Sequence, residues 1–163
     1  MKVYSLKIGI IGMFVVAITV FLAIPFACVR LDGLLRFPAI ATPLDTIVGV
    51  VLLVVGGAVA LWCVILFLAV GKGTPVPLSP PKRFIVRGPY KYTRNPMALG
   101  GWFMLIGETL ILHSFTLLLF VAFVIIPALT LFIIKYEEPD LEKRFGCEYL
   151  EYKKKVPRWI PRL

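Results

Sequence analysis

One apolar run, from Thr46 to Val70, constrains the fold more than any other feature, because it contains no charged residue. About 20 apolar residues in a helix are enough to cross a bilayer, and a helix satisfies its own backbone hydrogen bonds there. The composition agrees, since 60% of the residues are hydrophobic and 17% are charged, whereas about a quarter are charged in soluble domains. We therefore predict an all-α integral-membrane protein that forms a single domain over residues 1–163.

An earlier apolar run extends from Ile8 to Cys28. It is longer than the apolar core of a signal peptide, which has about 7–15 residues, so a retained transmembrane helix is predicted. Pro25 is expected to produce a bend or the exit from the membrane. The stretch from Val29 to Asp45 carries two arginines and two aspartates and is predicted to be a loop.

Two further apolar runs, Met97–Leu112 and Phe115–Ile134, are separated only by His113 and Ser114. The first would be about 24 Å long as a helix, somewhat less than the ~30 Å hydrocarbon core. Helices joined by so short a connection fold back on each other as an antiparallel hairpin. The prediction is therefore about four transmembrane helices, the last two forming a tight hairpin.

Small residues in the second apolar run provide surfaces that let another helix approach closely, as helices do in lipid. They are Gly49, Gly56, Gly57, Ala58 and Ala60. Packing within one bundle and dimerisation would use such surfaces equally well, and the pattern does not separate the two.

Positive charge is gathered in two parts of the chain. Of the 18 Lys and Arg residues, six lie between Lys72 and Arg94 and eight between Lys135 and Arg162. Such clusters occur on nucleic-acid-binding surfaces, but basic loops beside apolar helices are retained on the cytoplasmic side of membranes. The second explanation fits this chain, so no nucleic-acid partner is predicted. With four crossings and the N-terminus inside, a multi-pass topology places both clusters in the cytoplasm.

Two polar segments, 80–101 and 137–157, flank the predicted hairpin. The first follows the stretch Gly71–Pro81, whose four prolines predict an ordered, extended crossing. The second has Pro139 near the start of a predicted cytoplasmic amphipathic helix that ends at Val156-Pro157. Its apolar-aromatic face has helical spacing and consists of Leu141, Phe145, Tyr149 and Tyr152.

These two segments carry an ordered set of short motifs. They are Gly88-Pro89-Tyr90, Arg94-Asn95-Pro96, Glu137-Glu138, Phe145-Gly146, Tyr149, Tyr152 and Val156-Pro157. In this order and spacing the sequence resembles the integral-membrane methyltransferases that include isoprenylcysteine carboxyl methyltransferase and the phospholipid methyltransferases. The resemblance covers about residues 72–163. It implies two N-terminal spans over residues 1–70, followed by a methyltransferase core over residues 71–163.

The resemblance implies S-adenosylmethionine as the methyl donor, bound at the cytoplasmic face, and an acceptor that arrives from the bilayer. That acceptor would be a lipophilic small molecule, a phospholipid or a prenylated group, with membrane lipids as surroundings. The implied catalytic residues are Glu138, Lys155 and Asn95. The implied cofactor-binding residues are Gly88, Pro89, Tyr90, Arg94, Asn95, Pro96, Gly100, Glu137, Glu138, Tyr149 and Tyr152.

The chain departs from the family pattern at two of these positions. Many members have histidine where this chain has Asn95, which hydrogen-bonds but does not shuttle a proton at neutral pH. The arginine that commonly precedes Val-Pro is Lys155 here, which keeps the charge but loses the bidentate fork. A base role at Asn95 and a bidentate role at Lys155 are therefore in doubt.

The residue types suit this cofactor independently of the resemblance. Carboxylates suit its sulfonium cation and ribose diol, Arg94 or Lys155 suits its carboxylate, and tyrosine rings suit adenine or the cation. Backbone amides near Arg94–Met97 are further candidates for the anionic end. Methyl transfer needs alignment more than acid–base groups. A carboxylate acceptor requires no base, whereas an ammonium acceptor would need one, for which Glu138 and Tyr90 are candidates.

Two other classes of function remain open at this point. A membrane reductase related to the sterol reductases would use NADPH, and a non-catalytic scaffold or transporter would use no cofactor. The chain lacks a glycine-rich dinucleotide fingerprint, and its three cysteines have no metal-site spacing. Glu108 lies inside an apolar run, where a carboxylate is costly; a functional role and a structural hydrogen bond are both possible there.

Overall fold

The computed structural model describes residues 5–37, 42–76 and 78–161, and within these residues every regular element is helical. The first helix comprises α1 (Leu6–Ile18), η1 (Thr19–Ala23) and α2 (Ile24–Leu35), and the second comprises α3 (Pro43–Leu66) and η2 (Phe67–Gly71). A short 3₁₀ turn, η3 (Gly88–Lys91), precedes α4 (Pro96–Leu112). The remaining elements are α5 (Phe115–Phe120), η4 (Val121–Ile125), α6 (Ile126–Phe132), η5 (Ile133–Glu137), α7 (Glu138–Phe145) and α8 (Cys147–Lys155).

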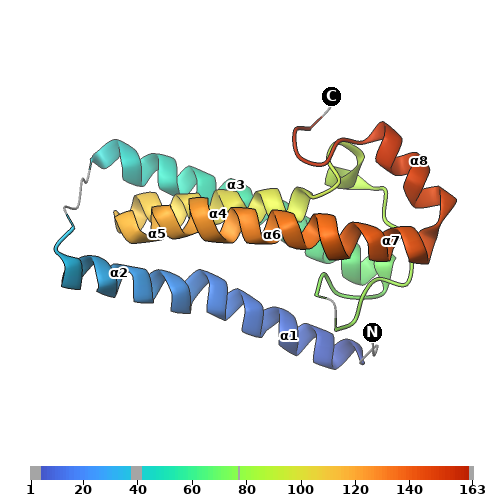
Figure 1. Cartoon of the computed structure of the whole chain (residues 1–163), viewed down its shortest axis with the longest axis horizontal. Coiled ribbons are helices and arrows are strands. Elements are labelled where there is room, and N and C mark those ends of the chain that lie inside the picture. Colours follow the sequence, from blue (N-terminus) through green and yellow to red (C-terminus); the bar gives the residue numbers. More distant parts are fainter. Residues whose placement is uncertain (1–4, 38–41, 77, 162–163) are drawn as a thin grey trace.

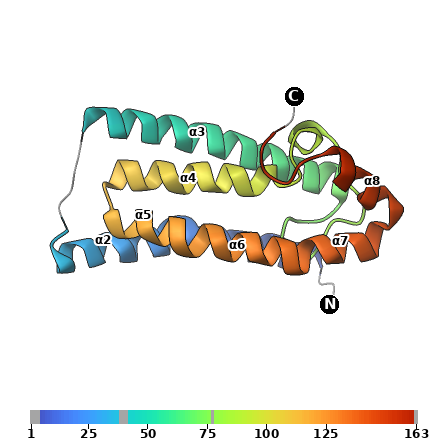
Figure 2. The same cartoon turned by 45° about the horizontal axis from the view of Figure 1, so that its top comes forward.

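Three of the resulting helices are long and apolar enough to cross a membrane: Leu6–Leu35, Pro43–Gly71 and Phe115–Phe145. The fourth apolar helix, α4, is shorter. Figures 1 and 2 show the helices running along the long axis, with α4 beside α3 and α5–α6 returning in the opposite direction. The start of α1, the end of α3, the start of α4 and the α7–α8 region all lie at one end.

Three prolines lie inside helices that nevertheless continue past them. Proline has no N–H to donate, and its ring crowds the carbonyl four residues earlier. A π-helical turn, which is wider than an α-helical turn, precedes each of these prolines: η1 before Pro25, η4 before Pro127 and η5 before Pro139. We infer that the wider turn relieves the crowding and lets the helix go on.

Two sequence predictions are corrected by these continuous helices. The first helix does not leave the bundle near Pro25 but extends to Leu35, so the predicted loop from Val29 is helical over its first part, while residues 38–41 lie outside the described residues. The last long helix does not end at Ile134 but reaches Phe145. Glu137 and Glu138 therefore belong to the same continuous helix that starts at Phe115.

The predicted C-terminal helix is divided at Gly146. This residue has a φ of +55° and a ψ of −128°, a backbone conformation that favours glycine. It turns the chain between α7 and α8, so α8 leaves the line of the long helix (Figure 1). The predicted apolar-aromatic residues still gather in one cluster around Phe84.

The described residues of the stretch 71–81, which exclude residue 77, are compact rather than extended. The Thr74 amide donates to the Ser79 carbonyl at 2.7 Å, and the Lys82 amide donates to the Gly71 carbonyl at 2.8 Å, so the chain reverses direction between them. Thr74 is fully buried. This turn lies against α1, because a Cβ added at Gly9 would come within 2.6 Å of Ser79 Cβ.

Helices α3 and α4 approach each other through glycine on both sides. A Cβ at Gly56 would lie 2.5 Å from the Gly100 carbonyl oxygen, and one at Gly107 would lie 2.6 Å from the Gly49 carbonyl oxygen. The prediction that Gly49 and Gly56 admit a neighbouring helix is confirmed. Gly57 is different, since a Cβ there would meet nothing within 4 Å.

This contrast predicts opposite effects of two adjacent substitutions. Gly56→Ala should destabilise the protein by about 1–3 kcal/mol, because the helices must move apart. Gly57→Ala should leave stability unchanged or slightly higher, since alanine favours a helix over glycine. Thermal unfolding of both variants in the same detergent measures the difference. Equal losses would contradict the close packing of α3 on α4.

Candidate functional site

Three segments distant in the sequence converge at the end of the bundle where α4 begins. They are the residues just before α4, the start of α7, and the segment Val156–Ile160 that follows α8, which we call the C-terminal strap (Figure 1). Both basic parts of the chain contribute side chains here. The predicted pairing of the two polar segments is therefore present, since Arg94 Nη1 lies 3.0 Å from Glu138 Oε1.

Glu138 is the centre of a buried charge cluster. Its side chain is 5% exposed, and three cations surround it. Arg158 donates from Nε to Oε1 at 2.8 Å and from Nη2 to Oε2 at 3.1 Å, while Lys153 Nζ lies 3.5 Å from Oε2. Burying a carboxylate is tolerable only with such compensation. Glu138 is thus committed to protein partners, and a direct role with ligand would require displacing one of them.

Arg94 is the member of the charge cluster with spare hydrogen-bonding capacity. Its side chain is 9% exposed, and the buried Nε and Nη1 have no hydrogen-bond partner within the described residues. The 3.0 Å contact of Nη1 with Glu138 is an ion pair that lies outside hydrogen-bond geometry. A buried donor left unsatisfied costs about 1–3 kcal/mol. Both atoms therefore retain hydrogen-bonding capacity that suits an anionic group of a ligand, in addition to the Glu138 carboxylate beside Nη1.

The C-terminal strap is hydrogen-bonded to the residues that precede α4. The Arg94 amide donates to the Pro157 carbonyl at 2.9 Å. Thr93 Oγ1 and Asn95 Nδ2 donate to the Arg158 carbonyl at 2.9 and 3.2 Å. The Arg94 amide was a candidate for binding an anion, but it already donates to the C-terminal strap. The Asn95 side chain likewise donates to the strap.

The three predicted tyrosines form the wall behind the charge cluster. Tyr90, Tyr149 and Tyr152 are 9%, 2% and 7% exposed. The Phe84 ring lies edge-on to Tyr149 and Tyr152, and the Tyr152 hydroxyl donates to the Tyr90 carbonyl at 2.7 Å. Burial and the Glu138 charge raise the pKa of Tyr149 to about 12, with the Arg94 guanidinium opposing that rise. Little ring face is left for a ligand.

Glu137 contrasts with its neighbour Glu138. Its side chain is exposed, and it makes no ion pair within the part of the chain that the structure describes. Burial and the neighbouring Cys63 raise the pKa of Tyr90, and the charge of Glu137 adds to that rise, so Glu137 lies close to Tyr90. Glu137 is therefore an accessible carboxylate beside the charge cluster.

Two glycines and two prolines of the predicted site shape the backbone. Gly88 has a φ of +57°, and a Cβ there would meet Trp62 at 3.0 Å. Pro89 lies in η3, and Pro96 begins α4. Gly100 lies in the α3–α4 contact, where a Cβ would meet the Gly56 carbonyl oxygen at 2.8 Å. Its observed surroundings are those of a packing residue.

Arg158, which the sequence analysis did not single out, is the basic residue of this region that contacts Glu138 through two hydrogen bonds, and Lys155 is not. Lys155 is exposed and makes no ion pair among the described residues, whereas Arg158 holds Glu138. The sequence analysis missed Arg158. The sequence does show a basic residue directly after Val156-Pro157. That its side chain points toward Glu138 follows only from the way the C-terminal strap folds back in the structure.

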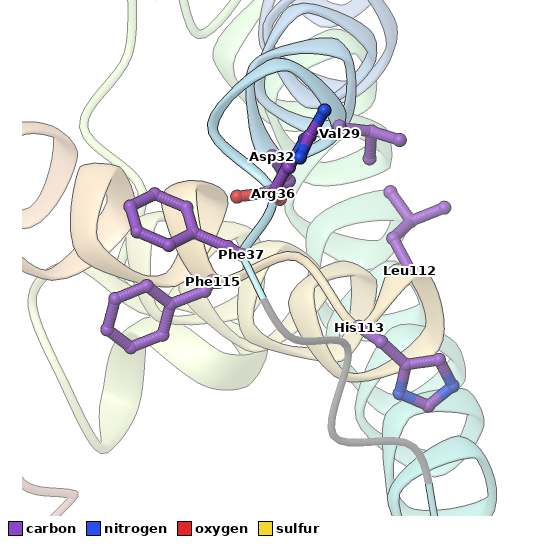
Figure 3. Close-up of a pocket in the computed structure, with 8 residues that line it drawn as sticks. Val29, Asp32, Arg36, Phe37, Leu112, His113 and Phe115 are labelled. Atoms are coloured by element: carbon purple, nitrogen blue, oxygen red, sulfur yellow. The ribbon is translucent and has the colours of Figure 1, made fainter.

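A cavity of about 440 Å³ lies at the other end of the bundle, bounded by Asp32, Arg36, Leu112 and His113 among others (Figure 3). Asp32 there accepts hydrogen bonds from Ser114 Oγ, Thr116 Oγ1 and the Thr116 amide, which ties the end of α2 to the start of α5. This cavity is remote from Glu138 and is not the predicted site.

Glu108 also lies away from the charge cluster. It is half-buried, and its Oε2 has no hydrogen-bond partner among the described residues. Twelve residues separate it from Pro96, which corresponds to about 18 Å along a helix. Its role stays open, and a contact with a ligand at Arg94 is excluded by that distance.

Comparison with known proteins defines the class. A family model described as phospholipid methyltransferase matches residues 44–148. The match runs from the start of α3 into α8 and includes both Arg94 and Glu138. No curated protein and no solved structure gave a significant match. The chain is thus a membrane methyltransferase by family. It belongs to the phospholipid methyltransferase family, as the order of its motifs indicated.

The burial of Glu138 predicts a large effect on stability. Glu138→Gln should destabilise the protein by about 3–5 kcal/mol, because it leaves the buried Arg94 guanidinium without its carboxylate. Glu142→Gln is the matched control: Glu142 pairs with Lys153 at 2.7 Å but is 36% exposed, so its loss should cost about 1 kcal/mol or less. Thermal unfolding in detergent compares them. A Glu138 variant as stable as the Glu142 variant would refute the charge cluster.

Proposed function

We propose that this protein is an S-adenosylmethionine-dependent methyltransferase that acts on a lipophilic acceptor held in the membrane. The observation that carries the proposal is the pair of buried, unpartnered Arg94 donors inside the charge cluster. They lie in a segment matched by a methyltransferase family. Guanidinium donors suit a carboxylate, and the amino-acid end of this cofactor carries one.

The remaining charges fit the other parts of the cofactor. Glu137 offers an accessible carboxylate to a cation or to a ribose diol. Glu138 does not meet the ligand directly; it holds Arg94 and Arg158 in place. When bound, S-adenosylmethionine supplies a methyl group on a sulfonium, which is activated for displacement. The protein then contributes alignment and the exclusion of water.

An ammonium acceptor would need to lose a proton, and Glu137 is the group best placed to take it. Glu138 is fully engaged by cations. Tyr90 is buried and its pKa is raised by that burial, so the phenol stays neutral and is a poor base. A carboxylate acceptor would need no base at all. The residues therefore accommodate both acceptor types that the family resemblance suggests.

The arrangement of the helices gives the proposed site access to a cofactor from water and to an acceptor from the lipid. The ends of α4 lie at opposite ends of the bundle (Figure 2), so α4 would be a fourth crossing despite its length. Arg94, Lys153 and Arg158 lie together at one end. By the positive-inside rule this end faces the cytoplasm, where a water-soluble cofactor is available, while the acceptor reaches the same end through the lipid.

The family match favours methyl transfer over a nicotinamide-dependent reductase. A scaffold or transporter would give no reason for an arginine with two buried donors that lack hydrogen-bond partners among the described residues.

Calorimetry on detergent-solubilised protein tests the cofactor. S-adenosylhomocysteine should bind, NADPH should not, and Arg94→Gln should weaken binding at least about tenfold, since a lost charged hydrogen bond is worth about 1.5–3 kcal/mol. Lys154→Gln, at an exposed lysine of α8, serves as the control and should bind like the wild type. Binding of NADPH alone would replace this proposal with the reductase.

The acceptor class is tested separately. Membranes containing the protein are incubated with methyl-labelled S-adenosylmethionine, and lipids are then separated from proteins. We expect label in the lipid extract that is lost with Arg94→Gln. Absence of label above background from both fractions, despite cofactor binding, would contradict a membrane-embedded acceptor.

A further inference from the structure

Glu138 has two carboxylate oxygens, and the cations around it do not share them equally. Arg158 engages both, through Nε to Oε1 at 2.8 Å and Nη2 to Oε2 at 3.1 Å. This is the planar, bidentate arrangement in which arginine binds a carboxylate best. Arg94 reaches Oε1 at 3.0 Å but outside hydrogen-bond geometry. Arg158 therefore holds one hydrogen bond on each oxygen of Glu138 and competes with Arg94 for that carboxylate.

We infer that Arg158 is a positioning residue: by occupying Glu138, it keeps Nε and Nη1 of Arg94 available for the carboxylate of the bound ligand. This inference rests on the proposed function. Without Arg158, Arg94 is free to close onto Glu138 as a bidentate pair and would lose the donors that the ligand needs. A less neutralised Glu138 would also repel the ligand's carboxylate, so both effects act in the same direction.

The surroundings of Arg158 hold it in this position. Its carbonyl accepts from Thr93 Oγ1 at 2.9 Å and from Asn95 Nδ2 at 3.2 Å, on either side of Arg94. The next residue, Trp159, packs against Trp102 of α4 with ring centroids 4.4 Å apart. The C-terminal strap is thus fixed to the residues before α4 at Arg158 itself and to α4 at Trp159. Arg158 lies beyond residue 148, where the family match ends.

The inference concerns one chemical group of the ligand, so two ligands that differ only in that group test it. They are S-adenosylhomocysteine and its decarboxylated analogue, which lacks the carboxylate and is otherwise the same. The wild type should prefer S-adenosylhomocysteine at least about tenfold, as expected for a charged hydrogen-bonded pair. Arg158→Ala should reduce this preference to near one by weakening S-adenosylhomocysteine alone.

Two further variants separate positioning from folding. Arg158→Lys keeps the charge without the fork, so it should regain thermal stability yet recover only part of the preference. Lys154→Ala removes a nearby exposed charge and should keep the full preference. Affinities are measured by calorimetry, with thermal unfolding as the check on folding.

The outcomes distinguish the inference from the proposed function. If the wild type binds neither ligand, the cofactor assignment itself fails. If the wild type binds S-adenosylhomocysteine but Arg158→Ala weakens both ligands equally, or keeps the preference, the positioning role is overturned while the cofactor assignment stands. Equal affinity of the wild type for the two ligands would likewise overturn it.

Discussion

The site depends on one buried carboxylate. Glu138 is placed at the end of a long helix that continues through two prolines, and it binds cations from the residues before α4, from α8 and from the C-terminal strap. A carboxylate with so little exposure is stable only while those cations stay. The polar end of the bundle is therefore held together by the same interaction that positions Arg94, the arginine proposed to bind the ligand.

The division of roles between adjacent acids follows from their exposure. Glu138 is buried and satisfied, whereas Glu137 is exposed and makes no ion pair among the described residues. A similar division applies to the arginines, because Arg158 is satisfied by Glu138 and Arg94 keeps two buried donors. In the proposed function, one residue of each pair supports the site and the other meets the ligand, which is the arrangement that precise positioning requires.

Much of this was accessible from the sequence, and the exceptions have physical reasons. The order of the motifs predicted that Arg94 and Glu138 meet, and glycines predicted that some helix packs closely on the second apolar run, without identifying that helix as α4. Helix ends were mispredicted because π-helical turns accommodate Pro25 and Pro139, which residue type alone does not reveal. Arg158 was missed because its contact with Glu138 depends on the path of the C-terminal strap after Pro157. Lys155 was chosen for its position in the motif, which does not show where its side chain points.

The most direct test of the central claim is a structure of the protein with S-adenosylhomocysteine bound. The account predicts the ligand's carboxylate at about 2.7–2.9 Å from Nε and Nη1 of Arg94, with Arg158 still on both oxygens of Glu138. A ligand carboxylate remote from Arg94, or Arg94 bound to Glu138 through both donors in the complex, would contradict it.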